Sequence, residues 1–164
     1  TFEEIYSLYQ FDKNLKYIFL KYTLEIETNI KALIANQVAF HYGLESYLDE
    51  EKLDNNASID NRKELILKIN HQIEDDYKAH SAITHYKDKY GFIPPFVLTK
   101  VLTFGLLSRY YGLLEQSDRQ AIAKKFKLSD NVLKQILKNL TFIRNISAHM
   151  DRIYSFRSNI LSSN

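Results

Sequence analysis

The chain has 164 residues, of which 45% are hydrophobic, with four Gly, two Pro and no Cys. This composition predicts one globular domain with a substantial core, and it argues against a disordered chain or a small disulfide-stapled one. The lack of Cys excludes disulfides and thiolate zinc sites. No apolar run is long enough to span a bilayer, so we expect a soluble, cytoplasmic protein with no membrane partner.

The formal net charge of +2 is unevenly distributed along the chain. Residues 1–99 carry 11 Lys and Arg against 16 Asp and Glu, whereas residues 100–164 carry 11 against 4. A basic C-terminal half favours a polyanionic partner such as RNA, although an excess of charge is more often a solvated surface.

Hydrophobic spacing in the first third of the chain predicts helices. A short amphipathic helix over residues 3–9 comes first. Asp12 is placed to cap a long helix whose apolar residues recur at threes and fours up to about Tyr42, where Gly43 ends it. The polar segment over residues 45–58 is expected to be a loop with one short helical turn.

The middle of the chain is predicted to contain two further helices. The first extends from a cap at Asp60 to about Tyr90. The second, over residues 96–114, is apolar on nearly every face, which predicts that it is the most buried helix. Gly105 within it lowers helix propensity, so we expect another helix or another chain to approach closely there.

The C-terminal part is predicted to hold a short helix over residues 118–126 and a long one that Ser129 caps and that reaches about Phe156. The expected fold is therefore an all-α bundle of about five to six helices, two or three of them long. We assign residues 1–157 to a single domain and residues 158–164 to a polar tail.

The segment over residues 144–149 concentrates groups that suit phosphodiester chemistry. At about 100° per residue, Asn145, His149 and Arg152 fall on one stripe of the expected helix, and Arg144 lies beside it. Guanidinium groups hold phosphate oxygens in a planar fork, and an imidazole transfers protons near neutral pH. On their own, such residues are more often surface or capping groups than a catalytic site.

No metal or cofactor site is predicted. His80 and His85, with Asp76, have no second pair at ligand spacing. Glycine-rich phosphate loops and the usual hydrolase motifs are absent from the sequence. Most of the 12 Tyr and 10 Phe lie on predicted core stripes, and Tyr154 is an aromatic candidate for stacking on bases.

Arg144-x4-His149 in the last long helix resembles the R-x4-6-H signature of the HEPN ribonucleases, in which Asn beside the Arg is a common form. Three stretches that span most of the chain are similar to the Abi-like (AbiD/AbiF) branch in particular, and they follow its order. The first is Tyr9-x-Phe11-Asp12 with Glu25-Ile26-Glu27. The second is Pro94-Pro95-Phe96-x-Leu98 with Leu102-Thr103-Phe104-Gly105, and the third extends from Ile143 to Arg152. The family pattern leads us to expect an acidic residue before the Thr-Phe-Gly element, and Lys100 departs from it.

The resemblance implies a bacterial antiphage or toxin-like protein that cleaves RNA without a metal or cofactor. In such a site a ribose 2′-OH attacks the adjacent phosphate, His149 acts as general acid or base, Arg144 neutralises charge on the phosphate oxygens, and Asn145 orients. We expect the RNA to be held as well by basic and aromatic side chains around this site, namely Arg152, Lys124, Lys125, Arg157 and Tyr154.

The same resemblance implies a homodimer, because one histidine is short of the two proton-transfer groups that the reaction prefers. The helices that carry Arg144 and His149 would then face each other across a composite cleft. A neutralising protein or RNA is a further expected partner.

Two alternatives to a ribonuclease stay open at this point. One is a regulatory HEPN module that binds RNA without cutting it, and the other is a helical interaction domain in which Arg144 pairs with Glu25 or Glu27. Burial of His149 among Leu side chains favours the interaction domain, whereas Arg144 and His149 along a basic groove favour RNA.

Overall fold

The computed structural model describes residues 1–149 and 152–154, and these ranges are helical, with no β-strand beyond one isolated bridge between Leu53 and Leu114. The all-α prediction is confirmed, and three of the helices are long. The described elements are α1 (Phe2–Tyr42), the 3-10 helices η1 (Ser46–Leu48) and η2 (Glu50–Lys52), α2 (Ile59–Asp76), α3 (Ser81–Tyr90), α4 (Pro95–Val101), α5 (Phe104–Leu113), α6 (Gln116–Lys124) and α7 (Asp130–Ala148).

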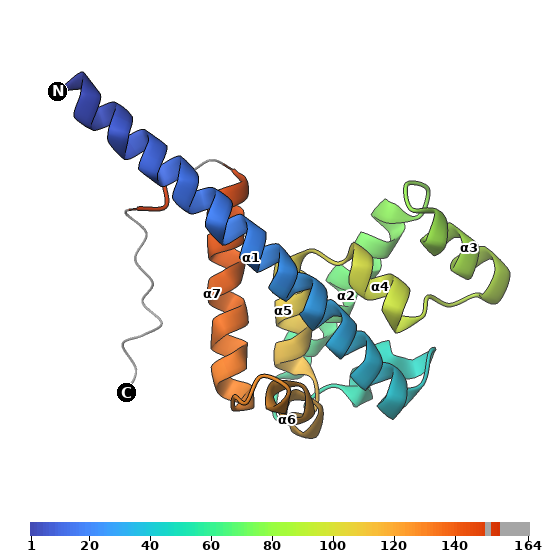
Figure 1. Ribbon diagram of the computed structural model, residues 1–164. Coiled ribbons are helices and arrows are strands. Elements are labelled where there is room, and N and C mark those ends of the chain that lie inside the picture. Colours follow the sequence, from blue (N-terminus) through green and yellow to red (C-terminus); the bar gives the residue numbers. More distant parts are fainter. Residues whose placement is uncertain (150–151, 155–164) are drawn as a thin grey trace.

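Helix α1 runs across the whole molecule, and α4, α6 and α7 pack along it (Figure 1). With 41 residues it is about 60 Å long. Its C-terminal half buries Ile30, Ile34 and Val38 in the main core. Gly43 ends the helix with a positive φ of 80°, as its position predicts. Within the described ranges, no helix combines the length and apolarity needed to cross a bilayer.

Before its apolar buried residues begin at Ile30, α1 turns a polar face inward and an apolar face outward. The buried residues of this part are Asp12, Lys16, Thr23 and Glu27. Apolar side chains that are exposed or half-buried recur on another side of the helix, and we call them the α1 stripe: Leu8, Phe11, Leu15, Ile18 and Tyr22. Their spacing of three and four residues is the heptad spacing by which one helix packs against another.

The predicted division of α1 into a short and a long helix is wrong, because Asp12 does not cap a helix. Its carboxylate lies 2.8 Å from Lys16 Nζ and accepts hydrogen bonds from the backbone N–H groups of Ile153 and Tyr154, at 2.9 and 3.0 Å. Thr1 caps α1 in a capping box with Glu4. Asp12 therefore joins the segment after α7 to α1.

Two predicted helices are each divided, so the described residues contain seven α-helices. The helix expected over residues 60–90 becomes α2, capped by Ser58, and α3. The helix expected over residues 96–114 becomes α4 and α5, since Thr103 Oγ1 accepts a hydrogen bond from Leu106 N–H and starts a new helix.

The close approach expected at Gly105 is made by α7. A Cβ atom at this glycine would lie 3.3 Å from Thr141 Cγ2, so α5 and α7 pack with little between them at this level. Ser129 caps α7 as predicted, its Oγ accepting from Val132 N–H at 3.3 Å. The start of α7 is also held by the buried Arg119, whose guanidinium pairs with Asp54 at 2.7 Å and Asp130 at 3.4 Å.

Replacing Asp12 with Ala is expected to reduce the free energy of unfolding by about 1.5–3 kcal/mol at pH 7, the range for hydrogen bonds to a charged group. Burial raises the pKa of Asp12, but the Lys16 ion pair and the two backbone donors outweigh it and the net shift is downward. The stabilisation is therefore complete above the unfolded pKa of about 3.9 and is lost as the pH falls through the lower folded value.

Urea unfolding of the wild type and Asp12→Ala at pH 7 and at pH 2–3 tests this expectation. The difference in the free energy of unfolding between the two proteins should be smaller at the acidic pH. Asp12→Asn keeps an oxygen that accepts hydrogen bonds from the backbone N–H groups. Its free energy of unfolding at pH 7 should therefore lie between those of the wild type and Asp12→Ala. A difference that stays constant with pH would contradict the assigned role of the charge.

Candidate functional site

Arg144 lies on α7 where this helix faces the polar side of α1. Its Nε atom is 3.9 Å from Glu27 Oε2, and Lys31 Nζ is 2.8 Å from the other carboxylate oxygen of Glu27. The Glu27 side chain is 10% exposed and that of Arg144 is 35% exposed. A buried carboxylate thus lies between a lysine from its own helix and an arginine from the last helix.

The contact between Glu27 and Arg144 is electrostatic rather than a hydrogen bond. Glu27 Oε2, Arg144 Nε and the nearby Ser147 Oγ are all buried, and none has a hydrogen-bond partner among the described residues. A buried polar atom without a partner costs about 1–3 kcal/mol. The Glu27–Arg144 contact therefore stabilises the structure less than a hydrogen-bonded ion pair would.

A pocket of about 470 Å³ opens beside this pair, between α1, the connection from α4 to α5, and α7. The charged groups that line it are Lys31, Lys100, Arg144 and Glu27, so cations exceed anions by two. Asn145 also lines the pocket and is exposed. The excess of positive charge suits a phosphate group, which Arg144 can bind with a planar fork.

His149 is exposed and occupies the C-cap position of α7, where its backbone N–H donates to Asn145 C=O at 2.9 Å. It lies about 7.5 Å further along the helix axis than Arg144. The pocket is lined by Arg144 and Asn145 but not by His149. Burial of His149 among Leu side chains, which would favour the interaction-domain alternative, is not observed.

The prediction that Arg152 continues the stripe of Asn145 and His149 is wrong. Helix α7 ends at Ala148 rather than near Phe156, and residues 152–154 are not helical. The two Asp12 hydrogen bonds hold this segment against α1. Arg152 and Tyr154 are exposed there, on either side of the buried Ile153.

The remaining predicted RNA contacts lie elsewhere or outside the described residues. Lys124 and Lys125 are exposed at the end of α6, which packs near the start of α7 (Figure 1). Because Arg144 is about 21 Å along α7 from its first residue, these lysines and Arg144 do not share a phosphate. Arg157 lies outside the described residues.

Sequence reasoning missed Lys31 and Lys100 as site residues. Glu27 and Lys31 have the i, i+4 spacing of a helical ion pair, and this signal was available in the sequence. In the sequence Lys100 is only a departure from the family pattern, whereas the fold places it in the same pocket. Among the residues described, no three His, Asp or Glu side chains gather as a metal site requires.

The sequence matches a known protein family. The family described as Abi-like protein matches residues 1–155, which is nearly the whole chain. No curated protein and no solved structure matches it.

Substituting Glu27 with Gln is expected to lower the free energy of unfolding by about 1–3 kcal/mol, because Lys31 and Arg144 then lose the one anion between them. Glu25→Gln is the matched control. Glu25 is exposed on the same helix, and its change should stay within about 0.5 kcal/mol. Urea unfolding measures both, and equal effects would contradict the structural role given to Glu27.

Proposed function

The chain belongs to the Abi-like protein family, and from this we propose that it is a metal-independent endoribonuclease of the HEPN type that acts in abortive-infection defence or as a toxin. The observation that carries the proposal is the position of Arg144. It lines a pocket with Asn145, Lys31 and Lys100, where cations outnumber anions. The exposure of His149, about 7.5 Å further along α7, supports the same assignment.

In the proposed reaction a phosphodiester lies in the Arg144 pocket. A ribose 2′-OH attacks the adjacent phosphorus, the bond to the 5′-oxygen of the next nucleotide breaks, and a 2′,3′-cyclic phosphate remains. Arg144 stabilises the charge that develops on the phosphate oxygens, Asn145 orients the group, and His149 transfers a proton. Glu27 acts as a positioning residue, since its carboxylate limits the directions that Arg144 can adopt.

A homodimer supplies the second proton-transfer group of this scheme. The α1 stripe lies at the same end of the molecule as the last turns of α7 (Figure 1). Phe11, Ile18 and Tyr22 within it are each more than half exposed, at 57%, 54% and 55%. Exposed apolar side chains at heptad spacing are typical of a helix that packs on another copy of itself, and such a pairing is two-fold symmetric.

A non-catalytic RNA-binding module is the second candidate. The observation that favours it is the distance of His149 from the pocket that Arg144 lines. The Glu27–Arg144 contact favours the interaction-domain alternative, because an ion pair between two helices can have a purely structural role. RNA cleavage separates the first candidate from the second, and RNA binding separates both from the third.

Purified protein is expected to cut labelled single-stranded RNA in the presence of EDTA and to leave 2′,3′-cyclic phosphate ends. Replacing His149 with Ala should slow cleavage by about 10²–10⁴-fold, the usual contribution of a general acid or base. His85→Ala, which removes an exposed histidine on α3, is the control and should cleave at the wild-type rate.

Three outcomes contradict the proposal in different ways. Loss of cleavage in EDTA would contradict the metal-independent mechanism. A His149→Ala protein that cuts as fast as the wild type would contradict the role of the imidazole in proton transfer. Binding of RNA without cleavage by any of the proteins would leave the RNA-binding module as the function.

Replacing both Phe11 and Ile18 with Glu is expected to convert a dimer into a monomer and to abolish cleavage. The physical reason is that two buried glutamates facing their copies would repel each other across the interface. Leu67→Glu is the control, because Leu67 is also 58% exposed but lies on α2, away from the stripe. Light scattering after gel filtration measures the mass, and a wild type that is monomeric yet active would contradict the dimer.

A further inference from the structure

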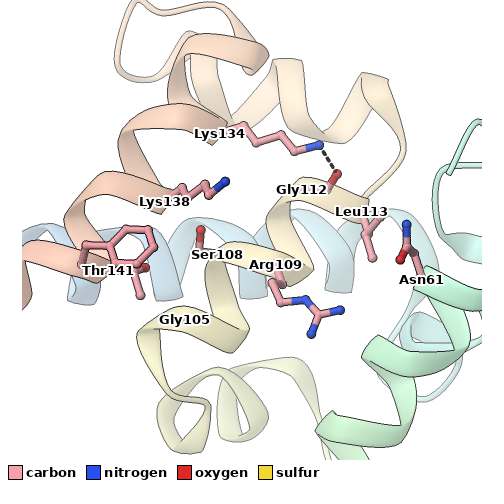
Figure 2. A pocket seen from close by; sticks show the side chains of 10 residues that line it. Asn61, Gly105, Ser108, Arg109, Gly112, Leu113, Lys134, Lys138 and Thr141 are labelled. Carbon is pink, nitrogen blue, oxygen red and sulfur yellow. Dashed lines mark hydrogen bonds between the residues drawn. The ribbon is translucent and has the colours of Figure 1, made fainter. Parts of the chain in front are cut away.

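A second hollow lies on the other side of Gly105, between α5 and α7 with α2 at its edge (Figure 2). It has a volume of about 430 Å³, and we call it the α5–α7 groove. The side chains of Lys134 and Lys138 extend from α7 toward α5, and Arg109 projects from α5 itself. The complete lining is Asn61, Gly105, Ser108, Arg109, Gly112, Leu113, Lys134, Lys138, Thr141 and Phe142.

The groove carries three cations and no acidic side chain in its lining. Lys138 Nζ has no hydrogen bond or ion pair with the residues described. Lys134 Nζ donates one hydrogen bond, to Gly112 C=O at 3.1 Å, and keeps its other donors. Arg109 is the only one of the three cations that an acid compensates, through Glu64 at 3.1 Å outside the lining. The groove therefore attracts anions.

Glu64 holds Arg109 in place at the edge of the groove. Hydrogen bonds from Lys68 and Arg109 lower the pKa of Glu64 to about 2, so it stays ionised at neutral pH. The Glu64 carboxylate also pairs with Lys68, whose Nζ lies 2.6 Å from Glu64 Oε1. Some donors of the Arg109 guanidinium remain available to a ligand, since Glu64 engages only Nη1 and Nη2.

The floor of the groove is formed by one face of α5 that carries small residues, Gly105, Ser108 and Gly112. A Cβ atom at Gly112 would come within 2.9 Å of Lys134 Cε, so the lysine stem lies directly on the backbone there. Phe142 stands at the groove with half of its side chain exposed. An aromatic ring beside several cations is the combination that binds single-stranded nucleic acids, because bases stack on the ring while the cations hold phosphates.

The α5–α7 groove and the Arg144 pocket meet at Gly105, which lines both. Helix α7 supplies Lys134, Lys138 and Thr141 to the groove, then Arg144 and Asn145 to the pocket. From Lys134 to Arg144 the helix rises about 15 Å. A strand that passes from one hollow to the other thus stays beside α7 and meets cations in both hollows.

We infer that the α5–α7 groove is a subsite for single-stranded RNA that flanks the phosphate held at Arg144, with Lys134, Lys138 and Arg109 contacting its backbone and Phe142 stacking on a base. The inference rests on the proposed function for the phosphate at Arg144. Duplex RNA is disfavoured as the ligand, because its bases are paired and cannot stack on Phe142.

Binding of 2′-O-methyl RNA oligomers tests the subsite without cleavage, since this RNA lacks the attacking hydroxyl. Fluorescence anisotropy of an eight-nucleotide oligomer is compared between wild type and Lys134→Gln/Lys138→Gln over a range of salt concentrations. Each lost phosphate contact lowers the salt slope by about 0.7, so the slope should fall by about 1.4. Affinity at 0.1 M salt should fall about tenfold or more.

Two further variants separate the groove from general charge. Lys78→Gln/Lys89→Gln removes the same charge from exposed positions away from the groove, and it should leave the slope unchanged. Phe142→Ala should weaken binding at least about fivefold without changing the slope, because stacking releases no counterions. A dinucleotide that occupies only the Arg144 pocket should bind the wild type and Lys134→Gln/Lys138→Gln equally.

Equal slopes for wild type and Lys134→Gln/Lys138→Gln would overturn the subsite and leave the cleavage assay with His149→Ala untouched. Absence of RNA binding by the wild type would overturn it as well, and acidic peptide binding in its place would assign the groove to a protein partner. Loss of slope together with no cleavage by any variant would support the groove while removing the catalytic proposal.

Discussion

The buried carboxylate of Glu27 governs how the first and last helices of this protein meet. Burying a carboxylate is costly unless cations compensate it, and here Lys31 lies at 2.8 Å and Arg144 at 3.9 Å. The contact between α1 and α7 at this level is therefore polar, unlike the core that Ile30, Ile34 and Val38 of α1 enter. The pocket beside this polar seam is lined by Glu27, Lys31, Lys100 and Arg144, so its wall is charged.

The polar seam has a consequence for the outer face of α1. Because Asp12, Lys16 and Glu27 occupy its inner face, the apolar residues of the same helical segment lie outside, where Phe11 and Ile18 remain exposed. Folding alone buries little of the apolar surface of such a helix segment. A partner that covers this surface would stabilise the helix further. The proposed site and the proposed dimer thus depend on the same distribution of side chains around α1.

Two hollows along α7 meet where α5 approaches this helix at Gly105. A larger residue at this position would press on Thr141, which lines the α5–α7 groove. The glycine therefore sets the depth of both hollows as well as the spacing of the helices. This geometry explains how one helix, α7, presents cations to two adjacent sites from successive turns.

The sequence by itself determined the helical class, the end of α1 at Gly43, the end of α3 near Tyr90 and the cap of α7 at Ser129, since periodicity and capping are local properties. It also identified Arg144 and Asn145 from a local motif. Only the tertiary structure decided that Asp12 receives backbone donors from 141 residues further along the chain, that α7 ends at Ala148, and that Lys31 and Lys100 join Arg144. Spacing shows which residues share a face of a helix, but the face that is covered, and by what, depends on contacts between segments far apart in the chain.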